Sequence, residues 1–272
     1  MKNKRGQSTS SPYIWDNIWA ETRDDEESWW WFCRETEGVR GRKIISYIEK
    51  FLGEMNGLKT IEIGSGAGVY SLVFAQYGAS VTLLDYSEKA LMLARKHFDL
   101  TGLSASYVSR DALNLHQNLW GKFDVAMSFG TIEHYRYPER FLMVKAHMDL
   151  VRKGGIIIIS VPNRWFFPHE ILKFCLQLRD KWQLGYEGAF TRQELLQLGT
   201  RLGLENMEIQ GSALITDIFR YLRIFQGTRF FRRFYQIRSK PASPRDLPSP
   251  FDNLLGADIF LMGRKPCVMQ SK

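Results

Sequence analysis

The sequence has few cysteines, no long apolar run and no targeting segment. Its three cysteines, Cys33, Cys175 and Cys267, are far apart and odd in number, so neither a disulfide framework nor a zinc site is indicated. The strongest apolar run, 156–161, is too short to span a bilayer. No apolar segment follows the basic N-terminus, as a signal peptide would require. These absences predict a cytoplasmic protein in a reducing compartment.

Acidic residues are missing from one long segment. Between Ile218 and Arg245 the chain has eight Arg and Lys residues and no Asp or Glu, which equals the formal net charge of +8. The same segment carries aromatic residues at helical spacing. One interpretation is an amphipathic element that contacts an anionic membrane and reaches a lipid-linked substrate, which would add a peripheral location at the inner membrane. Another is a cap with aromatics inward and arginines in water. RNA binding is a third.

Apolar, β-branched runs alternate with helical patterns along most of the chain. The strand-like runs are 59–64, 80–85, 105–111, 123–129, 154–162, 205–211 and 257–265. Helical patterns cover 68–77, 87–100 and 137–152, and a further helix begins at the capping box of Thr191 and Glu194. This alternation predicts an α/β fold: a Rossmann-like, doubly wound, seven-stranded and mostly parallel sheet with helices on both faces.

The flanks of this core differ from it in composition. Five tryptophans lie between Trp15 and Trp31, which favours a lid that excludes water, or a helix packed on the outer layer of the sheet. We expect five regions: a disordered tail over 1–12, an N-terminal helical lid over 13–57, a core over 58–213, a basic and aromatic cap over 214–256, and the last strand and tail over 257–272.

A glycine loop follows the first predicted strand. The stretch "IEIGSGAGVYS" places glycines at 64, 66 and 68, whereas a dinucleotide-binding turn needs its third glycine at 69, where this chain has Val69. Glycine allows a tight turn and close approach of a ligand, and the free amides of the next helix favour a negative group. The second strand ends in Asp85, where an acid can bind ribose hydroxyls. A nucleoside-type cofactor other than a dinucleotide is predicted.

The order E-x-G-x-G-x-G, helix, strand and Asp resembles the class I S-adenosylmethionine-dependent methyltransferases, specifically small-molecule methyltransferases with a type 11-like domain. "SRDALNL", "FDVAMSFGTIEHY" and "LVRKGGIIIISVPN" continue the resemblance in order. It implies S-adenosyl-L-methionine as cofactor. The glycine loop would hold the methionine end, Asp85 the ribose, and Tyr86 and Asp111 the adenine. The implied cofactor-binding residues are Glu62, Gly64, Ser65, Gly66, Gly68, Asp85, Tyr86, Asp111, Ala112, Ser128, Phe129 and Gly130.

The acceptor side is less well defined. His134 titrates in the range needed for a general base, and Glu133 could orient it or accept a proton. The pair resembles the E-x-x-E-H sequence of quinone-biosynthesis O-methyltransferases, but Gly130 replaces its first acid, so no metal is predicted. The alternative is that both residues support the next helix. His169 follows "RWFFP", and Glu187 and Gly188 stand where relatives often carry a histidine.

Signals of nucleic-acid methylation are missing. The chain has "SFGT" where adenine amino-methyltransferases carry a D/N-P-P-Y loop, and its one Pro-Cys pair, Pro266-Cys267, follows the final strand. We therefore predict transfer to oxygen of a small-molecule or lipid-linked acceptor, and no nucleic-acid partner. The alternatives are an RNA methyltransferase that uses the basic cap, and a methyltransferase-fold protein that binds cofactor without turnover.

Overall fold

A seven-stranded sheet forms the centre of the computed structural model, which describes residues 11–21, 38–225 and 248–267. The strands are β1 (Lys59–Ile63), β2 (Ser80–Asp85), β3 (Ala105–Ser109), β4 (Phe123–Phe129), β5 (Val151–Pro162), β6 (Glu205–Gly211) and β7 (Asp258–Arg264). Their spatial order is β3-β2-β1-β4-β5-β7-β6. The first five are parallel, and β7 is antiparallel to both its neighbours. The predicted fold class is confirmed.

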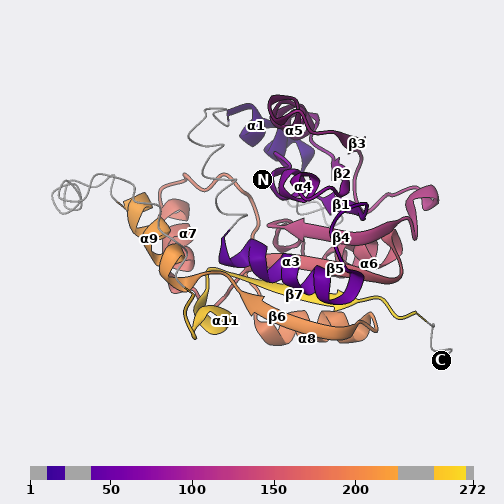
Figure 1. The fold of residues 1–272 in the computed structure, drawn as a ribbon. Coiled ribbons are helices and arrows are strands. Elements are labelled where there is room, and N and C mark those ends of the chain that lie inside the picture. Colours follow the sequence, from indigo (N-terminus) through magenta and orange to yellow (C-terminus); the bar gives the residue numbers. More distant parts are fainter. Residues whose placement is uncertain (1–10, 22–37, 226–247, 268–272) are drawn as a thin grey trace.

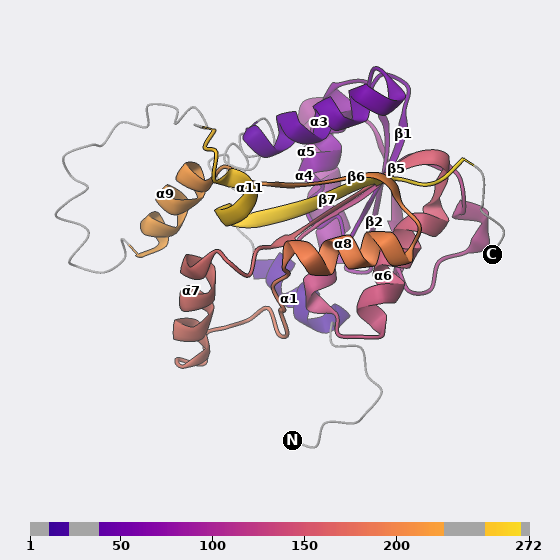
Figure 2. The ribbon, with the colours of Figure 1, turned by 90° about the horizontal axis from the view of Figure 1, so that it is seen from below.

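Helices cover both faces of the sheet (Figures 1 and 2). On one face lie α3 (Val39–Leu52), α4 (Val69–Gln76) and α5 (Glu88–Thr101), and on the other α6 (Glu139–Leu150) and α8 (Arg192–Arg201). Strand β5 shows why two apolar layers form. Ile156 and Ile158 pack with the first layer, while Ile157 and Ile159 pack with the second, because successive side chains of a strand point to opposite faces.

The remaining elements gather beyond the carboxyl ends of the parallel strands (Figure 1). They are α1 (Pro12–Glu21), the 3-10 turn η2 (Ile132–His134), α7 (Phe167–Gln177), α9 (Leu214–Phe225) and α11 (Asp252–Leu255). A second 3-10 turn, η1 (Gln117–Leu119), precedes β4. In open α/β sheets this edge is where ligands bind. The loops and helices at this edge are therefore the place to look for a site.

The chain leaves the sheet after β6 and returns at β7 through one hydrogen-bonded pair. The amide of Ser212 donates to the carbonyl of Asp258, and the amide of Asp258 donates to the hydroxyl of Ser212, both at 2.9 Å. The Ser212 hydroxyl donates in turn to Asp217 at the start of α9. These hydrogen bonds therefore hold together the two ends of the segment that contains α9 and α11.

Most element boundaries agree with the prediction to within a few residues, with two differences. Strand β5 begins at Val151 rather than at 154, because Val151 pairs with Phe123 across a register shift. Helix α7 was not predicted, and its apolar side chains Phe167, Ile171 and Phe174 are exposed. The tail 1–10, the lid residues 29–32 and the basic segment 226–247 lie outside the described residues.

Within the described ranges, none of the helices has the length and apolar character that crossing a bilayer requires.

Candidate active site

The glycine loop between β1 and α4 adopts a conformation that only glycine tolerates well. Gly64, Gly66 and Gly68 all have positive φ, at 64°, 50° and 70°. A Cβ on Gly64 would lie 2.5 Å from the side chain of Thr131, and one on Gly68 would lie 2.2 Å from that of Leu83. The loop is held to the sheet because the amides of residues 64 and 65 donate to the carbonyl of Leu84. A glycine is therefore required at each position for a structural reason.

The side chain of Glu62, on β1, makes hydrogen bonds to the start of α4 just after the glycine loop. Its Oε2 accepts hydrogen bonds from the Ser71 amide at 3.0 Å and from the Ser71 hydroxyl at 2.6 Å. Burial raises the pKa of Glu62 to about 7, against the opposing effect of those two bonds. The side chain thus orders the first turn of α4 through two hydrogen bonds to Ser71.

Asp85 connects the ends of β1 and β2. Its Oδ2 accepts from the Gly66 amide at 2.9 Å, and its Oδ1 accepts from the Ser87 amide at 2.8 Å. Burial raises the pKa of Asp85, although these backbone bonds oppose the shift. Each carboxylate oxygen has two acceptor positions, so both can accept a further hydrogen bond. The carboxylate is fixed in place and retains capacity for a pair of ligand hydroxyls.

Helix α1 lies against the glycine loop and the turn after β4. Asp16 accepts a hydrogen bond from the Ser87 hydroxyl at 2.6 Å. The ring of Trp19 lies 2.5 Å from where a Cβ on Gly66 would be. The ring of Trp15 meets that of His134 edge to face, with centroids 4.8 Å apart. One helix thus contacts both the predicted cofactor side and the predicted acceptor side.

The residues predicted beside the adenine lie at the ends of β2 and β3. Tyr86 is half-buried and follows Asp85 directly, and Ala112 is buried. Asp111 is exposed, and its Oδ1 accepts from the Leu113 amide at 2.9 Å, as in an Asp that starts a turn. This hydrogen bond positions the Asp111 side chain through Oδ1 and does not involve Oδ2.

The end of β4 brings three more of the predicted residues toward the loop. Phe129 stacks on Tyr70 of α4, with ring centroids 3.6 Å apart. Gly130 has φ of 71° and donates its amide to the carbonyl of Ser160. Within the described part of the chain, the buried hydroxyls of Ser65 and Ser128 have no hydrogen-bond partner. Since buried polar atoms normally have partners, these two hydroxyls mark a place where a polar ligand fits.

Glu133 and His134 are both buried in η2, directly after β4. Nδ1 of His134 lies 2.9 Å from the carbonyl of Tyr186, which fixes the proton on Nδ1 and leaves Nε2 as the acceptor nitrogen. Burial lowers the pKa of His134, so its imidazole is neutral at neutral pH. Burial raises the pKa of Glu133 well above its usual value, and Oε2 of that carboxyl has no partner among the described residues.

Arg140 is a buried residue of this region that the sequence did not single out. Its guanidinium donates to the carbonyls of Tyr135, Glu133 and Gly188, at 2.9, 3.3 and 3.2 Å. It also lies over the ring of Phe190. The spacing of Arg140 on α6 resembles that of any helix-surface arginine, so only the tertiary structure reveals that it joins η2 to the loop over 185–190.

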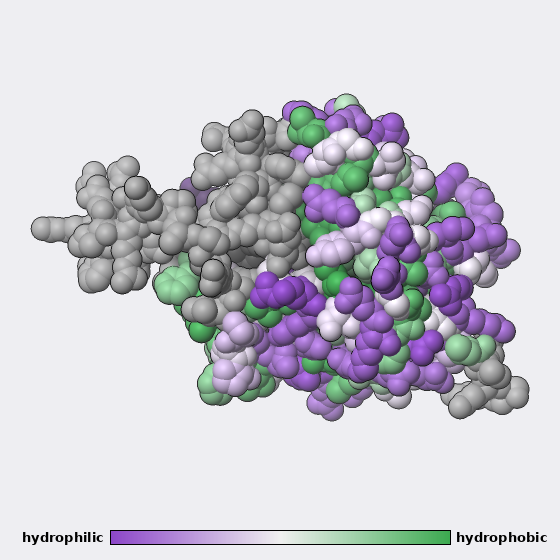
Figure 3. Space-filling model, in the orientation of Figure 1, coloured by the Kyte–Doolittle hydropathy of each residue, from purple (hydrophilic) through white to green (hydrophobic). Residues whose placement is uncertain are grey.

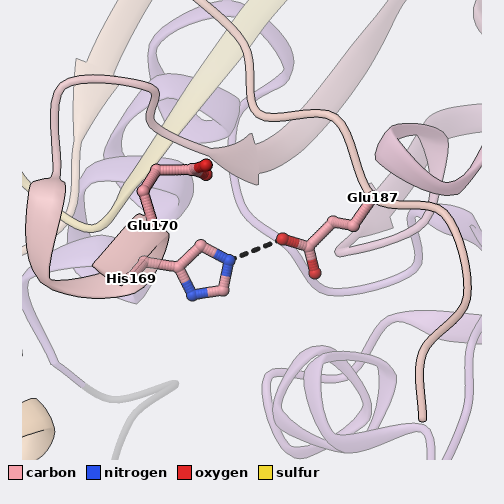
Figure 4. A group of neighbouring side chains, drawn as sticks. All are labelled: His169, Glu170 and Glu187. Carbon is pink, nitrogen blue, oxygen red and sulfur yellow. Dashed lines mark hydrogen bonds and ion pairs between the residues drawn. The ribbon is translucent and has the colours of Figure 1, made fainter. Parts of the chain in front are cut away.

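His169 lies on α7 in a cluster with Glu170 and Glu187 (Figure 4), and Lys173 of the same helix is close to both carboxylates. Its Nε2 lies 2.5 Å from Oε1 of Glu187, and its Nδ1 lies 2.8 Å from the hydroxyl of Tyr221 on α9. Donor atoms of His169, Glu170 and Glu187 lie within 4.8 Å of one another, the one such group in the described residues with metal-ligand chemistry. However, the ammonium of Lys173 is 2.7 Å from Glu170 and 3.8 Å from Glu187. A cation already balances these carboxylates.

Comparisons with known proteins agree with this geometry. Residues 61–155 match the model of a family described as methyltransferase domain. The ubiquinone biosynthesis O-methyltransferase of Pseudomonas aeruginosa is 30% identical over 189 residues, covering 66% of this chain and 80% of that protein.

Solved structures share the fold. A methyltransferase from Thermotoga maritima superposes with a TM-score of 0.58 at 18% identity, covering 93% of this chain and 98% of the other. Magnesium protoporphyrin IX methyltransferase from Synechocystis, solved with S-adenosylhomocysteine, gives 0.56 at 16% identity, covering 93% of each chain.

The chain therefore belongs to the class I S-adenosylmethionine-dependent methyltransferases. It is an enzyme that takes its methyl group from S-adenosyl-L-methionine, as the glycine loop and Asp85 predicted. A dinucleotide cofactor was not predicted, because Val69 stands where a dinucleotide-binding turn needs its third glycine.

Proposed function

We propose that the enzyme transfers the methyl group to a hydroxyl oxygen of a small-molecule acceptor. The observation that carries this proposal is the neutral, buried imidazole of His134, whose Nδ1 is held by the Tyr186 carbonyl. A neutral imidazole with a directed acceptor nitrogen can take the proton of a hydroxyl as the oxygen is methylated. The similarity to proteins named O-methyltransferases also supports oxygen as the atom that receives the methyl group.

The cofactor fits the residues at the carboxyl edge of the sheet. The fixed carboxylate of Asp85 suits the ribose hydroxyls, and the amides at the start of α4 suit the methionine carboxylate. The two unpartnered hydroxyls, Ser65 and Ser128, lie on the glycine loop and at the end of β4, where they would supply hydrogen bonds to the same end. Tyr86, Asp111 and Ala112 would border the adenine. When bound, the cofactor supplies an electrophilic methyl group on a sulfonium.

For the acceptor side we propose His134 as the general base and Glu133 as a neutral neighbour. Burial raises the pKa of Glu133 well above its usual value, which favours the protonated carboxyl, and in that form the group can donate a hydrogen bond. In that form it does not accept a proton. It would orient an acceptor oxygen, while the proton passes to Nε2 of His134.

Helix α1 is proposed as a lid. Its three contacts, from Asp16 to Ser87, from Trp19 to Gly66 and from Trp15 to His134, span the edge of the sheet from β2 to η2. A cofactor bound below it would be shielded from water, which strengthens the electrostatic interactions of the site. The lid would have to open for the cofactor to exchange.

A second proposal concerns how the acceptor arrives: we infer peripheral contact with an anionic membrane. Helix α7 exposes Phe167, Ile171, Phe174 and Leu178, which are 59%, 55%, 60% and 70% accessible. These residues recur every three or four positions and so share one side of the helix. Ile218 and Phe219 of the neighbouring α9 are also exposed, and apolar residues reach the surface where α9 and α11 lie (Figure 3).

Charge and position support this second proposal. Six of the eight basic residues counted above follow α9 in the sequence and two lie within it, and together they would attract anionic lipid headgroups. The inner side of α7 carries His169 and Lys173, next to the loop that holds His134. A lipid-linked acceptor could therefore enter along α7 with its polar end first.

The test of the main proposal is methyl transfer from labelled S-adenosylmethionine to extracts that are separated into polar metabolites, lipids and RNA. We expect label in a metabolite or lipid fraction, with mass analysis locating the added 14 Da on oxygen. Substituting His134→Ala should lower kcat by about 10²–10⁴-fold while the cofactor Kd stays the same. Label in RNA alone would refute the proposal.

A further inference from the structure

The loop between α7 and α8 holds two histidines through consecutive residues. The backbone carbonyl of Tyr186 accepts from Nδ1 of His134 at 2.9 Å, and the side chain of Glu187 accepts from Nε2 of His169 at 2.5 Å. The next residue, Gly188, donates its amide to the carbonyl of Glu133 at 3.0 Å. This short stretch therefore fixes η2 and α7 relative to each other, and Glu187 is the one acidic side chain in it.

Two carboxyl groups lie near His134, and their pKa values shift in opposite directions. Burial raises the pKa of Glu133 well above its usual value, which favours its neutral form. Burial also raises the pKa of Glu187, but the hydrogen bond from His169 and the electrostatic interactions with His169, His134 and Lys173 together outweigh that effect, so the net shift is downward. The side chain of Glu187 is only 4% exposed. A buried carboxylate of this kind is retained only with close partners.

We propose that Glu187 is the positioning residue of the acceptor side: it orients His169 by a direct hydrogen bond and supplies the negative charge on which protonation of His134 depends. The inference rests on the proposed function. As the acceptor oxygen takes the methyl group, its proton moves to Nε2 of His134 and creates an imidazolium in a buried place. Such a charge is costly without a nearby anion, and Glu187 suits that role better than Glu133, because burial favours the neutral form of Glu133.

Four elements of the described structure contribute charged or titratable groups around Glu187. Helix α7 contributes His169, Glu170 and Lys173; η2 contributes Glu133 and His134; α6 contributes Arg140; and α9 contributes Tyr221. Arg140 lowers the pKa of His134, and Glu187 raises it. Lys173 stays close to both Glu170 and Glu187, so the cluster already contains its cation and needs no metal.

The test compares Glu187→Gln, Glu187→Asp and Glu170→Gln in the full chain. We follow the ring signals of His134 and His169 by NMR across pH, the pH profile of kcat/KM, and cofactor affinity. Because the Glu187 charge raises the pKa of His134, its removal should lower that pKa and move the acidic limb of the profile to lower pH. The plateau of kcat should fall by about tenfold or more, since the imidazolium is no longer stabilised.

The controls separate this role from a structural one. Glu187→Asp keeps the charge and should keep the His134 titration near its original position. Glu170→Gln removes a charge from the same cluster without touching either histidine and should leave the profile unchanged. If His134 titrates identically in Glu187→Gln and in the original protein, the proposal is overturned. The NMR measurement needs no acceptor, so a failure to find one tests the proposed function and leaves this test intact.

Discussion

Oε1 of Glu187 lies 2.5 Å from Nε2 of His169, a residue eighteen positions earlier on a different element. The bond joins the loop over 185–190 to α7, and the adjacent Tyr186 joins the same loop to η2. The proposed acceptor side thus contains η2 and α7, which both make hydrogen bonds to this one loop. Substitutions in that loop should affect both histidines at once, which makes its neighbours good targets for experiment.

Asp85→Ala should weaken binding of S-adenosylmethionine by about 10- to 100-fold, since hydrogen bonds to a charged group contribute about 1.5–3 kcal/mol each. Isothermal titration calorimetry measures the change. The matched control is Asp124→Ala, because that carboxylate also bridges strands, through the Lys59 amide and Arg152, but at the amino end of the sheet. Equal effects of the two substitutions would mean that Asp85 acts only through folding.

Asp16→Ala should speed release of the cofactor. The substitution removes the 2.6 Å hydrogen bond between α1 and Ser87, which is one of the contacts that would hold the proposed lid closed. One hydrogen bond of about 1 kcal/mol corresponds to about a fivefold faster dissociation rate. Stopped-flow experiments measure the dissociation rate of the cofactor. The reference variant is Glu21→Ala, because Glu21 is an exposed residue on the same helix. A dissociation rate equal to that of the reference would argue against a lid.

The cofactor-free enzyme should lose stability between about pH 4.5 and pH 7 through Glu62. Its pKa is raised from 4.5 to about 7 by burial, so the folded state favours the protonated carboxyl. The stabilisation is complete below the unfolded pKa and is lost as pH rises through the folded one. Glu62→Gln should therefore gain Tm relative to the original protein as pH rises from 5 to 8. A constant difference across that range would contradict the pKa of Glu62.

Arg140→Met should destabilise the fold by about 2–4 kcal/mol, because it leaves several buried carbonyls without donors. Denaturant unfolding measures this loss. Arg136→Met is the comparison: Arg136 lies over the ring of Tyr186, 3.8 Å from the centroid, but is exposed. That substitution should cost under about 1 kcal/mol. Similar losses for the two would show that the buried bonds of Arg140 contribute little.

Phe174→Ser combined with Leu178→Ser should reduce flotation with phosphatidylglycerol vesicles. The two side chains are 60% and 70% exposed on α7, and their apolar area would be buried in a bilayer surface. Leu100→Ser on α5, where Leu100 is 69% exposed, is the matched control and should float as the original protein does. If the original protein stays at the bottom with these vesicles, the membrane proposal is refuted.

The sequence predicted the sheet and the cofactor well because both depend on local patterns. Alternating apolar runs define strands, and Gly64, Gly66 and Gly68 have positive φ in a loop whose spacing is readable without tertiary structure. The order of the strands in the sheet was not predicted and comes from the structure. The cofactor-binding residues taken individually remain proposals, although Asp85 and Glu62 have the contacts that such roles require.

The acceptor side was harder to predict, because its contacts cross long stretches of chain. Nothing near Arg140 or Glu187 in the sequence indicates a partner on η2 or α7. The sequence also suggested that Glu133 could accept a proton, whereas burial favours its protonated form. Burial at a given position depends on packing from several elements, and a linear pattern does not show it.

The hydrogen-bonded pair of Ser212 and Asp258 has a consequence for how such enzymes diversify. The chain leaves the sheet at Ser212 and re-enters it at Asp258, and these two residues are hydrogen-bonded to each other. The free energy needed to close the segment between them depends only weakly on its length, since each doubling adds only about 0.6 kcal/mol of closure entropy. Evolution can lengthen, shorten or exchange that segment while the donor half of the enzyme stays unchanged. Grafting the corresponding segment of a relative between these two residues therefore tests directly whether the segment determines which acceptor is methylated.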